Sequence, residues 1–379
     1  MTKYDFDRTI DRRIAHSRKW DVLDNEISLT VADTDYQVMD EIMEEVNRIN
    51  LLGRFGYTSP DERYFNSYVH WFGSRYQAKF EVEDCLFSTG VVASIDSILK
   101  HLGKPHDKVM MFTPIYNVFY NCVRNNDCDL LECPLTYHNY QYFIDWELFD
   151  KQIKNAKFFI LCNPHNPVGM MFDRTDLEKI SKACLENNVY LISDEIHADI
   201  DYNQNRYVSM LNDFNNDKLI VCLSPGKTFN LAGMHSSIVV VKNEILRDFI
   251  QAGLWKDDIG EPSYFGVDPV SIAYLEGETY VTEMNKYLKA NRELFIEFLK
   301  GYPKLHLVKN THTYLLWIDI SEYGLDSDKF VQKLREKTGL LVASGKVYGD
   351  PRFIRINIAT SKQIIEESLQ RLEKFIKNL

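Results

Sequence analysis

The sequence predicts an α/β protein with a mostly parallel sheet and crossover helices, and three observations predict this fold class. Short β-rich runs alternate with helical stretches between about residue 51 and about residue 274. Three of the apolar runs end in polar motifs, as strands do at the crevice of an open α/β sheet. The chain has 379 residues, 45% of them hydrophobic, which is enough to bury one large core or the cores of two domains.

The first half of this region predicts a strand, a helix and a second strand. The strand ends at residues 88–90, and residues 91–102 form a helix because their apolar side chains recur at helical spacing. A second strand covers residues 107–112. Three further strands follow as apolar runs, at residues 158–162, 189–192 and 219–223.

The C-terminal third predicts a smaller α+β unit. A long amphipathic helix over residues 280–299 begins it. The other predicted elements are strands at residues 314–320 and 353–358 and helices at residues 327–337 and 361–379. We therefore expect a large domain over residues 46–278, a small domain over residues 279–379, and an N-terminal segment, residues 1–45, that joins the small domain.

The composition excludes several classes of protein. The net charge of −11, from 44 basic and 55 acidic residues, argues against nucleic-acid binding. The longest apolar runs, such as residues 238–241, are far too short to span a membrane, and the N-terminus has no signal-peptide core. Seven cysteines without a Cys-x-x-Cys pair indicate reduced thiols in a cytoplasmic protein. His101 and His106 lack partners at metal-ligand spacing, so no metal site is expected.

Three polar motifs follow the last three strands of the large domain. They are Asn-Pro-His-Asn-Pro-Val-Gly at residues 163–169, Ser-Asp-Glu-Ile-His at residues 193–197 and Ser-Pro-Gly-Lys-Thr-Phe-Asn at residues 224–230. Because such strand ends meet at one crevice, an amide, the Asp194 carboxylate and the Lys227 amine are expected to lie together. Pyridoxal phosphate (PLP) needs this set: the lysine forms its Schiff base, the acid pairs with its pyridine nitrogen and the amide bonds its ring oxygen.

Each of these residues has a plainer explanation when it is taken alone. A lysine in a turn is most often a surface residue, and an aspartate after an apolar strand often caps the next helix. The acids Asp199 and Asp201 beyond Asp194 indicate a solvated face. The prediction of a cofactor site therefore depends on the three motifs meeting in space.

Three further places supply candidate contacts for the phosphate, for the pyridine ring and for a substrate. Residues 89–92 place Gly90 before a helix, where free backbone N–H groups bind anions, although a glycine before a helix is common. Tyr116 has the shape to stack on a pyridine ring or simply to pack. Arg355 lies in the middle of an apolar strand and needs a partner, which is either a bound carboxylate or an internal acid.

With these motifs, the chain resembles fold-type I PLP enzymes of the aminotransferase class I/II superfamily. The Asn-Pro motif at residues 163–169 with a downstream Asp194 and Lys227 is typical of the superfamily. Within it, the chain is most similar to the MalY/PatB group of cystathionine β-lyases, because His197 stands where typical aminotransferases carry tyrosine. The other similar segments are residues 11–13, 19–21, 31–35, 55–58, 314–319 and 355–359, so the resemblance covers nearly the whole chain.

The resemblance implies a seven-stranded, mostly parallel sheet and a role for each site residue. It implies that Lys227 carries PLP and shuttles the proton, and that Asp194 holds the pyridine nitrogen. The other cofactor ligands that it implies are Asn166 and His197 at the ring oxygen, Tyr116 on the ring face, and Gly90, Val91, Val92 and Ser224 at the phosphate.

The resemblance also implies how the substrate binds. Arg355 takes the substrate α-carboxylate, assisted by backbone near Ala32 and Asp33. Tyr57 reaches into the active site of a neighbouring subunit, so the functional unit is a homodimer. His235 departs from the pattern, because aminotransferases place a phosphate-binding arginine there.

The function that the resemblance implies is an α,β-elimination of cysteine thioethers to a thiol, pyruvate and ammonia. The physiological thioether stays open among cystathionine, S-alkyl cysteines and cysteinyl dipeptides. The alternatives are a PLP-dependent aminotransferase, which shares the first steps, and a regulatory binding protein of the same fold.

Overall fold

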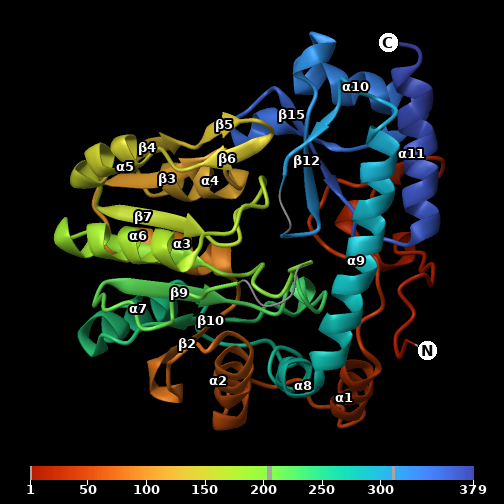
Figure 1. Ribbon diagram of the computed structural model, residues 1–379. Coiled ribbons are helices and arrows are strands. Elements are labelled where there is room, and N and C mark those ends of the chain that lie inside the picture. Colours follow the sequence, from red (N-terminus) through yellow and green to blue (C-terminus); the bar gives the residue numbers. More distant parts are fainter. Residues whose placement is uncertain (1, 203–206, 310–311) are drawn as a thin grey trace.

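The computed structural model describes residues 2–202, 207–309 and 312–379 of the chain (Figure 1). A seven-stranded sheet of order β2-β10-β9-β8-β7-β3-β4 forms the centre of the larger part of the fold. β10 is antiparallel to both of its neighbours, and the other neighbouring strands are parallel. The strands are β2 Cys85–Ser88, β3 Lys108–Thr113, β4 Asp129–Pro134, β7 Phe158–Cys162, β8 Tyr190–Asp194, β9 Leu219–Leu223 and β10 Ser237–Val240.

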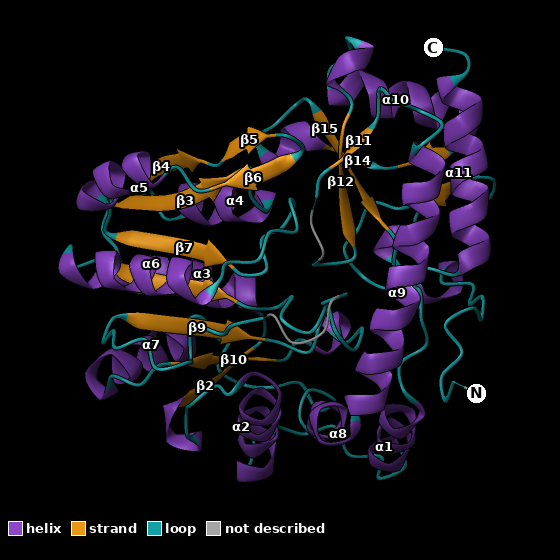
Figure 2. Ribbon diagram, viewed as in Figure 1, coloured by secondary structure: helices purple, strands orange, loops and turns teal. Residues whose placement is uncertain are grey.

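Helices pack against both faces of this sheet, because successive strand residues point to opposite faces (Figure 2). Val109 and Phe158 pack with α3, α4 and α7, whereas Met110 and Phe159 face α2, α5, α6 and α8. The helices are α2 Glu62–Tyr76, α3 Val91–Leu102, α4 Asn117–Asn125, α5 Trp146–Gln152, α6 Arg174–Glu186, α7 Glu244–Lys256 and α8 Asp268–Glu276. The predicted α/β class with a mostly parallel sheet is confirmed.

A second, antiparallel sheet of order β11-β12-β15-β14 forms the core of the C-terminal part. The long helix α9 runs from α1 and α8 up to this part and lies beside α11 (Figure 1). The elements are α1 Asp40–Asn50, α9 Glu278–Leu299, β11 His306–Leu307, β12 Leu315–Asp319, α10 Ser327–Thr338, β14 Ala343–Ser344, β15 Phe353–Asn357 and α11 Lys362–Ile376.

The N-terminal residues are joined to this C-terminal part by a short parallel strand pair. β1 (Ile27–Ser28) pairs with β13 (Leu340–Leu341). The pair supports the proposal that residues 1–45 belong with the small domain. A separate hairpin is formed by β5 (Thr136–His138) and β6 (Gln141–Phe143).

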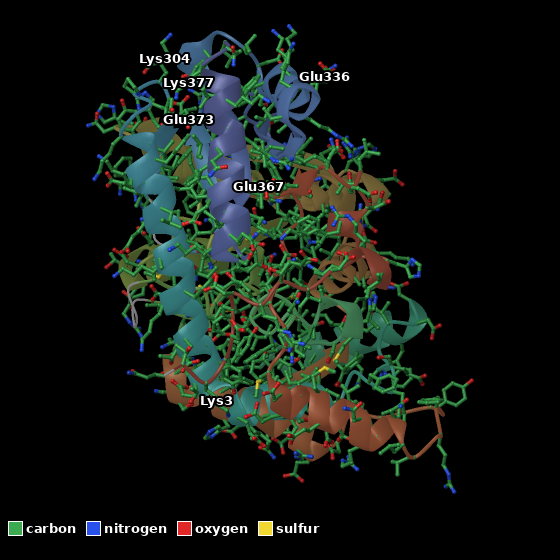
Figure 3. All side chains as sticks on the ribbon, turned by 90° about the vertical axis from the view of Figure 1, so that its right-hand side faces the viewer. Lys3, Lys304, Glu336, Glu367, Glu373 and Lys377 are labelled. Carbon is green, nitrogen blue, oxygen red and sulfur yellow. The ribbon has the colours of Figure 1, made fainter. Side chains whose placement is uncertain are left out.

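The side chains of α11 show why this C-terminal segment forms an amphipathic helix. Glu367 and Glu373, which Figure 3 labels, pair with Arg371 and Lys377 one turn later at 2.6 and 2.7 Å. Leu372 on the opposite face is buried. α11 is thus an amphipathic helix, and within the described residues no helix is long and apolar enough to cross a membrane.

The predicted elements agree with the structure to within one or two residues at most ends. The predicted helix at residues 91–102 is α3, and the runs at residues 158–162 and 219–223 are β7 and β9. The run at residues 189–192 is displaced, because β8 continues through Ser193 to Asp194. Asp194 is therefore the last residue of a strand and not a residue of the following turn.

Candidate active site

The three polar motifs do meet at the carboxyl ends of adjacent parallel strands. Asp194 ends β8, while Asn166 and Lys227 follow β7 and β9. All three side chains line one cavity of about 590 Å³. Six more of the predicted site residues line the same cavity: Ala32, Gly90, Val91, Val92, Tyr116 and His197.

The Lys227 amine is held by a backbone carbonyl. Its Nζ donates a hydrogen bond to the Ala32 carbonyl at 2.6 Å. Burial lowers the pKa of Lys227 to about 8, with Arg355 adding to the effect and Asp33 and Asp194 opposing it. Because a neutral amine is the nucleophile, this pKa makes Lys227 suited to forming a Schiff base near neutral pH.

The turn that presents Lys227 is built by the Ser-Pro-Gly sequence. The Ser224 hydroxyl accepts a hydrogen bond from the Gly226 N–H at 3.2 Å and donates one to the Ser236 carbonyl at 3.1 Å. A Cβ on Gly226 would lie 3.3 Å from the Ser224 Oγ and 3.4 Å from the Ala232 Cα, so the turn packs closely around this glycine. Unlike the other predicted phosphate ligands, Ser224 does not line the cavity.

Asp194 is a buried carboxylate with few partners. Its Oδ1 accepts the Ile196 N–H at 3.1 Å, and its Oδ2 faces the Cys162 thiol at 3.8 Å. Burial raises the pKa of Asp194 to about 6, although the Ile196 N–H, Lys227 and Cys162 all favour the charged form. A cationic ring nitrogen beside this carboxylate would stabilise its charged form further.

The beginning of α3 forms a place for an anion. Gly90 is the N-cap residue and makes no side-chain cap, so the first N–H groups of the helix are open to a ligand. A Cβ on Gly90 would meet nothing within 4 Å, which shows that the space before the helix is open. The exposed His235 lines the cavity together with Thr89.

Arg355 in β15 is buried where the C-terminal part meets the residues that follow β7. It donates hydrogen bonds to Asn166 Oδ1 at 3.2 Å and to the Thr30 carbonyl at 2.7 Å, and its guanidinium lies 4.6 Å from the centre of the Tyr348 ring. No acidic side chain of the described ranges forms an ion pair with Arg355. This arrangement favours a bound carboxylate over an internal acid as its partner.

Tyr57 lies outside this cavity. Its side chain is fully exposed, on a loop that precedes α2. That Tyr57 enters the active site of a neighbouring subunit therefore stays a prediction.

Asp199 corrects one sequence prediction, because it is buried and does not lie on a solvated face. Its carboxylate accepts hydrogen bonds from the Trp71 indole at 2.9 Å, from Tyr76 and from the Thr228 hydroxyl at 2.9 Å. Thr228 is the neighbour of Lys227, so Asp199 anchors the lysine turn. Asp201 is buried as well.

Open polar atoms in the cavity and beside it fit PLP and its substrate. Within the described part of the chain, His197 Nδ1 and Arg355 Nε have no hydrogen-bond partner although both are buried. Burial, together with the nearby Lys227 and Arg355 charges, holds the pKa of His197 well below its ordinary value, so the imidazole is neutral. With the Lys227 amine, the Asp194 carboxylate and the open end of α3, the fold and the site define a PLP-dependent enzyme of fold type I.

Comparison with known proteins agrees with this class. Residues 24–372 match the aminotransferase class I and II family. Cystathionine beta-lyase PatB of Bacillus subtilis is 31% identical over 382 residues, which cover 97% of this chain and 98% of that protein. This chain therefore belongs to the aminotransferase class I and II family.

Two solved structures have the same fold along their whole length. Cystalysin from Treponema denticola, which contains a pyridoxal 5'-phosphate cofactor, has a TM-score of 0.94 and 28% identity and covers 99% of both chains. The PLP-bound C-S lyase from Staphylococcus hominis has a TM-score of 0.93 and 28% identity, covering 99% of this chain and 98% of that one. The predicted family and cofactor are thus confirmed.

Proposed function

We propose that this protein is a PLP-dependent carbon–sulfur β-lyase that converts cysteine thioethers to a thiol, pyruvate and ammonia. One observation carries the proposal: the Lys227 amine, the Asp194 carboxylate and the neutral His197 line one cavity that Arg355 borders through Asn166. The similarity to a cystathionine β-lyase and to C-S lyases supports it.

Bound PLP supplies an electron sink for the bonds at the substrate Cα. Lys227 Nζ would carry the cofactor, and we propose that the same amine, when it is free, takes the Cα proton of the substrate. The Asp194 carboxylate holds the pyridine nitrogen protonated by charge attraction. Asn166 and His197 hold the ring oxygen, Tyr116 stacks on the ring, and the N–H groups of Gly90, Val91 and Val92 with Ser224 hold the phosphate.

The substrate end of the site sets which bond breaks. Arg355 would bind the α-carboxylate, assisted by backbone near Ala32, which is the residue whose carbonyl holds the Lys227 amine. After the proton leaves Cα, the C–S bond at the β carbon breaks and the thiolate departs with the electron pair. Hydrolysis of the remaining three-carbon unit gives pyruvate and ammonia.

The test is a panel of three thioethers on the purified, PLP-loaded protein: cystathionine, an S-alkyl cysteine and a cysteinyl dipeptide. We expect equal amounts of thiol and pyruvate from at least one of them. The second candidate function is an aminotransferase, which the family as a whole favours. Amino transfer that depends on added keto acid, without thiol release, would establish that alternative.

We also propose a homodimer in which Tyr57 of each subunit enters the neighbouring site. The loop before α2 exposes large apolar side chains, with exposed fractions of 84% for Leu51 and 61% for Phe55, which supports a partner surface there. The proposal also includes a large domain over residues 46–278, a small domain over residues 279–379 that the N-terminal segment 1–45 joins, and a cytoplasmic location.

A further inference from the structure

The Ala32 carbonyl accepts two hydrogen bonds, and only one of them comes from the lysine. Lys227 Nζ donates to it at 2.6 Å and the Tyr314 hydroxyl donates at 3.1 Å. Tyr314 is fully buried, and its ring lies edge-on to His197 with ring centres 6.0 Å apart. Burial also raises the pKa of Tyr314 well above its ordinary value, so the hydroxyl stays a donor.

Hydrogen bonds from side chains to the backbone carbonyls hold the segment around Ala32 in place. Residues 30–34 form neither helix nor strand, yet each of their carbonyls accepts a hydrogen bond from a side chain. The donors are Arg355 to Thr30, Asn357 to Val31 and Asp33, Lys227 and Tyr314 to Ala32, and Arg12 to Thr34, at 2.6 to 3.1 Å. Segment 30–34 therefore has little freedom to follow the amine if the amine moves.

Buried charges fix the far end of the segment. Asp35 accepts hydrogen bonds from Lys19 and from the Trp20 indole, both at 2.8 Å. Arg12 bonds both Asp33 and Asp35 at 2.9 Å. Since removing one partner of a buried ion pair is costly, these contacts hold the segment against the site.

We propose that Tyr314 is a positioning residue for the Lys227 amine. A carbonyl oxygen has two lone-pair directions, and the Tyr314 hydroxyl occupies one of them on Ala32. The amine is thereby restricted to the other direction, which fixes where it waits for the Cα proton. The proposal rests on the proposed function only in that Lys227 moves this proton, a step that a lyase and an aminotransferase share.

The test compares Tyr314→Phe with Tyr202→Phe in the PLP-loaded protein. Tyr202 is the matched control, because its buried hydroxyl also donates to a carbonyl, that of Thr313, but not to Ala32. The readout is exchange of the Cα hydrogen of L-alanine in deuterated water, followed by NMR, because alanine has no β leaving group. Cofactor content and its visible absorbance are measured alongside.

We expect Tyr314→Phe to slow exchange about tenfold at saturating alanine, with KM and cofactor content close to wild type. Tyr202→Phe should stay within about twofold, since a typical single hydrogen bond away from the site alters stability more than rate. A p-aminophenylalanine at position 314, whose N–H replaces the hydroxyl donor, should restore most of the rate.

Wild-type exchange in Tyr314→Phe, an equal loss in both phenylalanine variants, or no recovery with p-aminophenylalanine would each overturn the positioning role. Thiol release is assayed separately on the wild type. If the wild type exchanges the Cα hydrogen of alanine but releases no thiol from any thioether, the proposed lyase function fails while the comparison of variants still decides the role of Tyr314.

Discussion

The two sides of the active-site cavity are built in different ways. On the cofactor side, Asn166, Asp194 and Lys227 stand at the carboxyl ends of β7, β8 and β9, so side chains supply the chemistry. On the substrate side, the irregular segment 30–34 is held in place through its backbone carbonyls, which accept hydrogen bonds from Arg355 and Asn357 of β15. The cofactor side is fixed by adjacent parallel strands. The substrate side forms only when distant parts of the chain pack together.

The largest expected effect is on the cofactor side. Lys227→Ala removes the amine that bonds PLP, so thiol release should fall more than about 10⁴-fold and the visible absorbance of the bound cofactor should disappear. Lys218→Ala is the control, because this lysine lies at the opposite end of β9. A Lys227→Ala protein that still releases thiol at the wild-type rate would refute the site.

Asp194→Asn should have the next largest effect. The change keeps the shape of the side chain but removes the charge that holds the ring nitrogen protonated, so kcat should fall by about 10²- to 10³-fold. Glu195→Gln is the control, since Glu195 is equally buried but bonds Ser209 at 2.6 Å and Tyr207. Glu195→Gln should lower the free energy of unfolding by about 1–3 kcal/mol and leave kcat nearly unchanged. A large loss of kcat in Glu195→Gln with little loss in Asp194→Asn would instead assign the charge at the ring nitrogen to Glu195.

Arg355→Lys tests the substrate side. A lysine has no planar fork to reach Thr30, Asn166 and a carboxylate together, so kcat/KM should fall roughly 10²-fold, mainly through a higher KM. Arg352→Lys, just before β15, alters an arginine that pairs with Asp350 at 2.6 Å and should leave KM unchanged. An unchanged KM in Arg355→Lys would show that the substrate carboxylate binds elsewhere.

The smallest effect concerns pH and links the two sides. The pKa of Lys227 is lowered to about 8. The fraction of protein with a neutral Lys227 amine therefore rises about tenfold per pH unit below that value and levels off above it. The rate at which cofactor-free protein captures PLP, followed by absorbance, should rise with pH in the same way. Because Asp33 raises the pKa of Lys227, Asp33→Asn should shift the midpoint to lower pH, whereas the exposed Asp21→Asn should not.

The sequence predicts the cofactor side well, for a physical reason. The apolar runs at residues 158–162 and 219–223 are β7 and β9 to the residue, because strands buried on both faces are continuous apolar runs. Once those strands are adjacent and parallel, the residues that follow them are brought together by topology alone. The confirmed family and cofactor depend on this part of the chain.

The substrate side leaves little trace in the sequence. A carbonyl belongs to every residue, so nothing about Ala32 distinguishes it as an acceptor for Lys227 and Tyr314. The wrong prediction for Asp199 has a related cause: Trp71, which buries it, lies 128 residues away in the chain. Tertiary partners of this kind decide burial, and local pattern does not record them.

The hydrogen bonds from Arg355 to Thr30 and from Asn357 to Val31 close loops of 325 and 326 residues. Such closures come late in folding, because their entropic cost is met only after the intervening chain is compact. During synthesis, the turn bearing Lys227 leaves the ribosome well before β15 does. In the newborn polypeptide the Lys227 amine is therefore exposed and protonated, and it becomes a nucleophile only after segment 30–34 and the C-terminal part have packed around it.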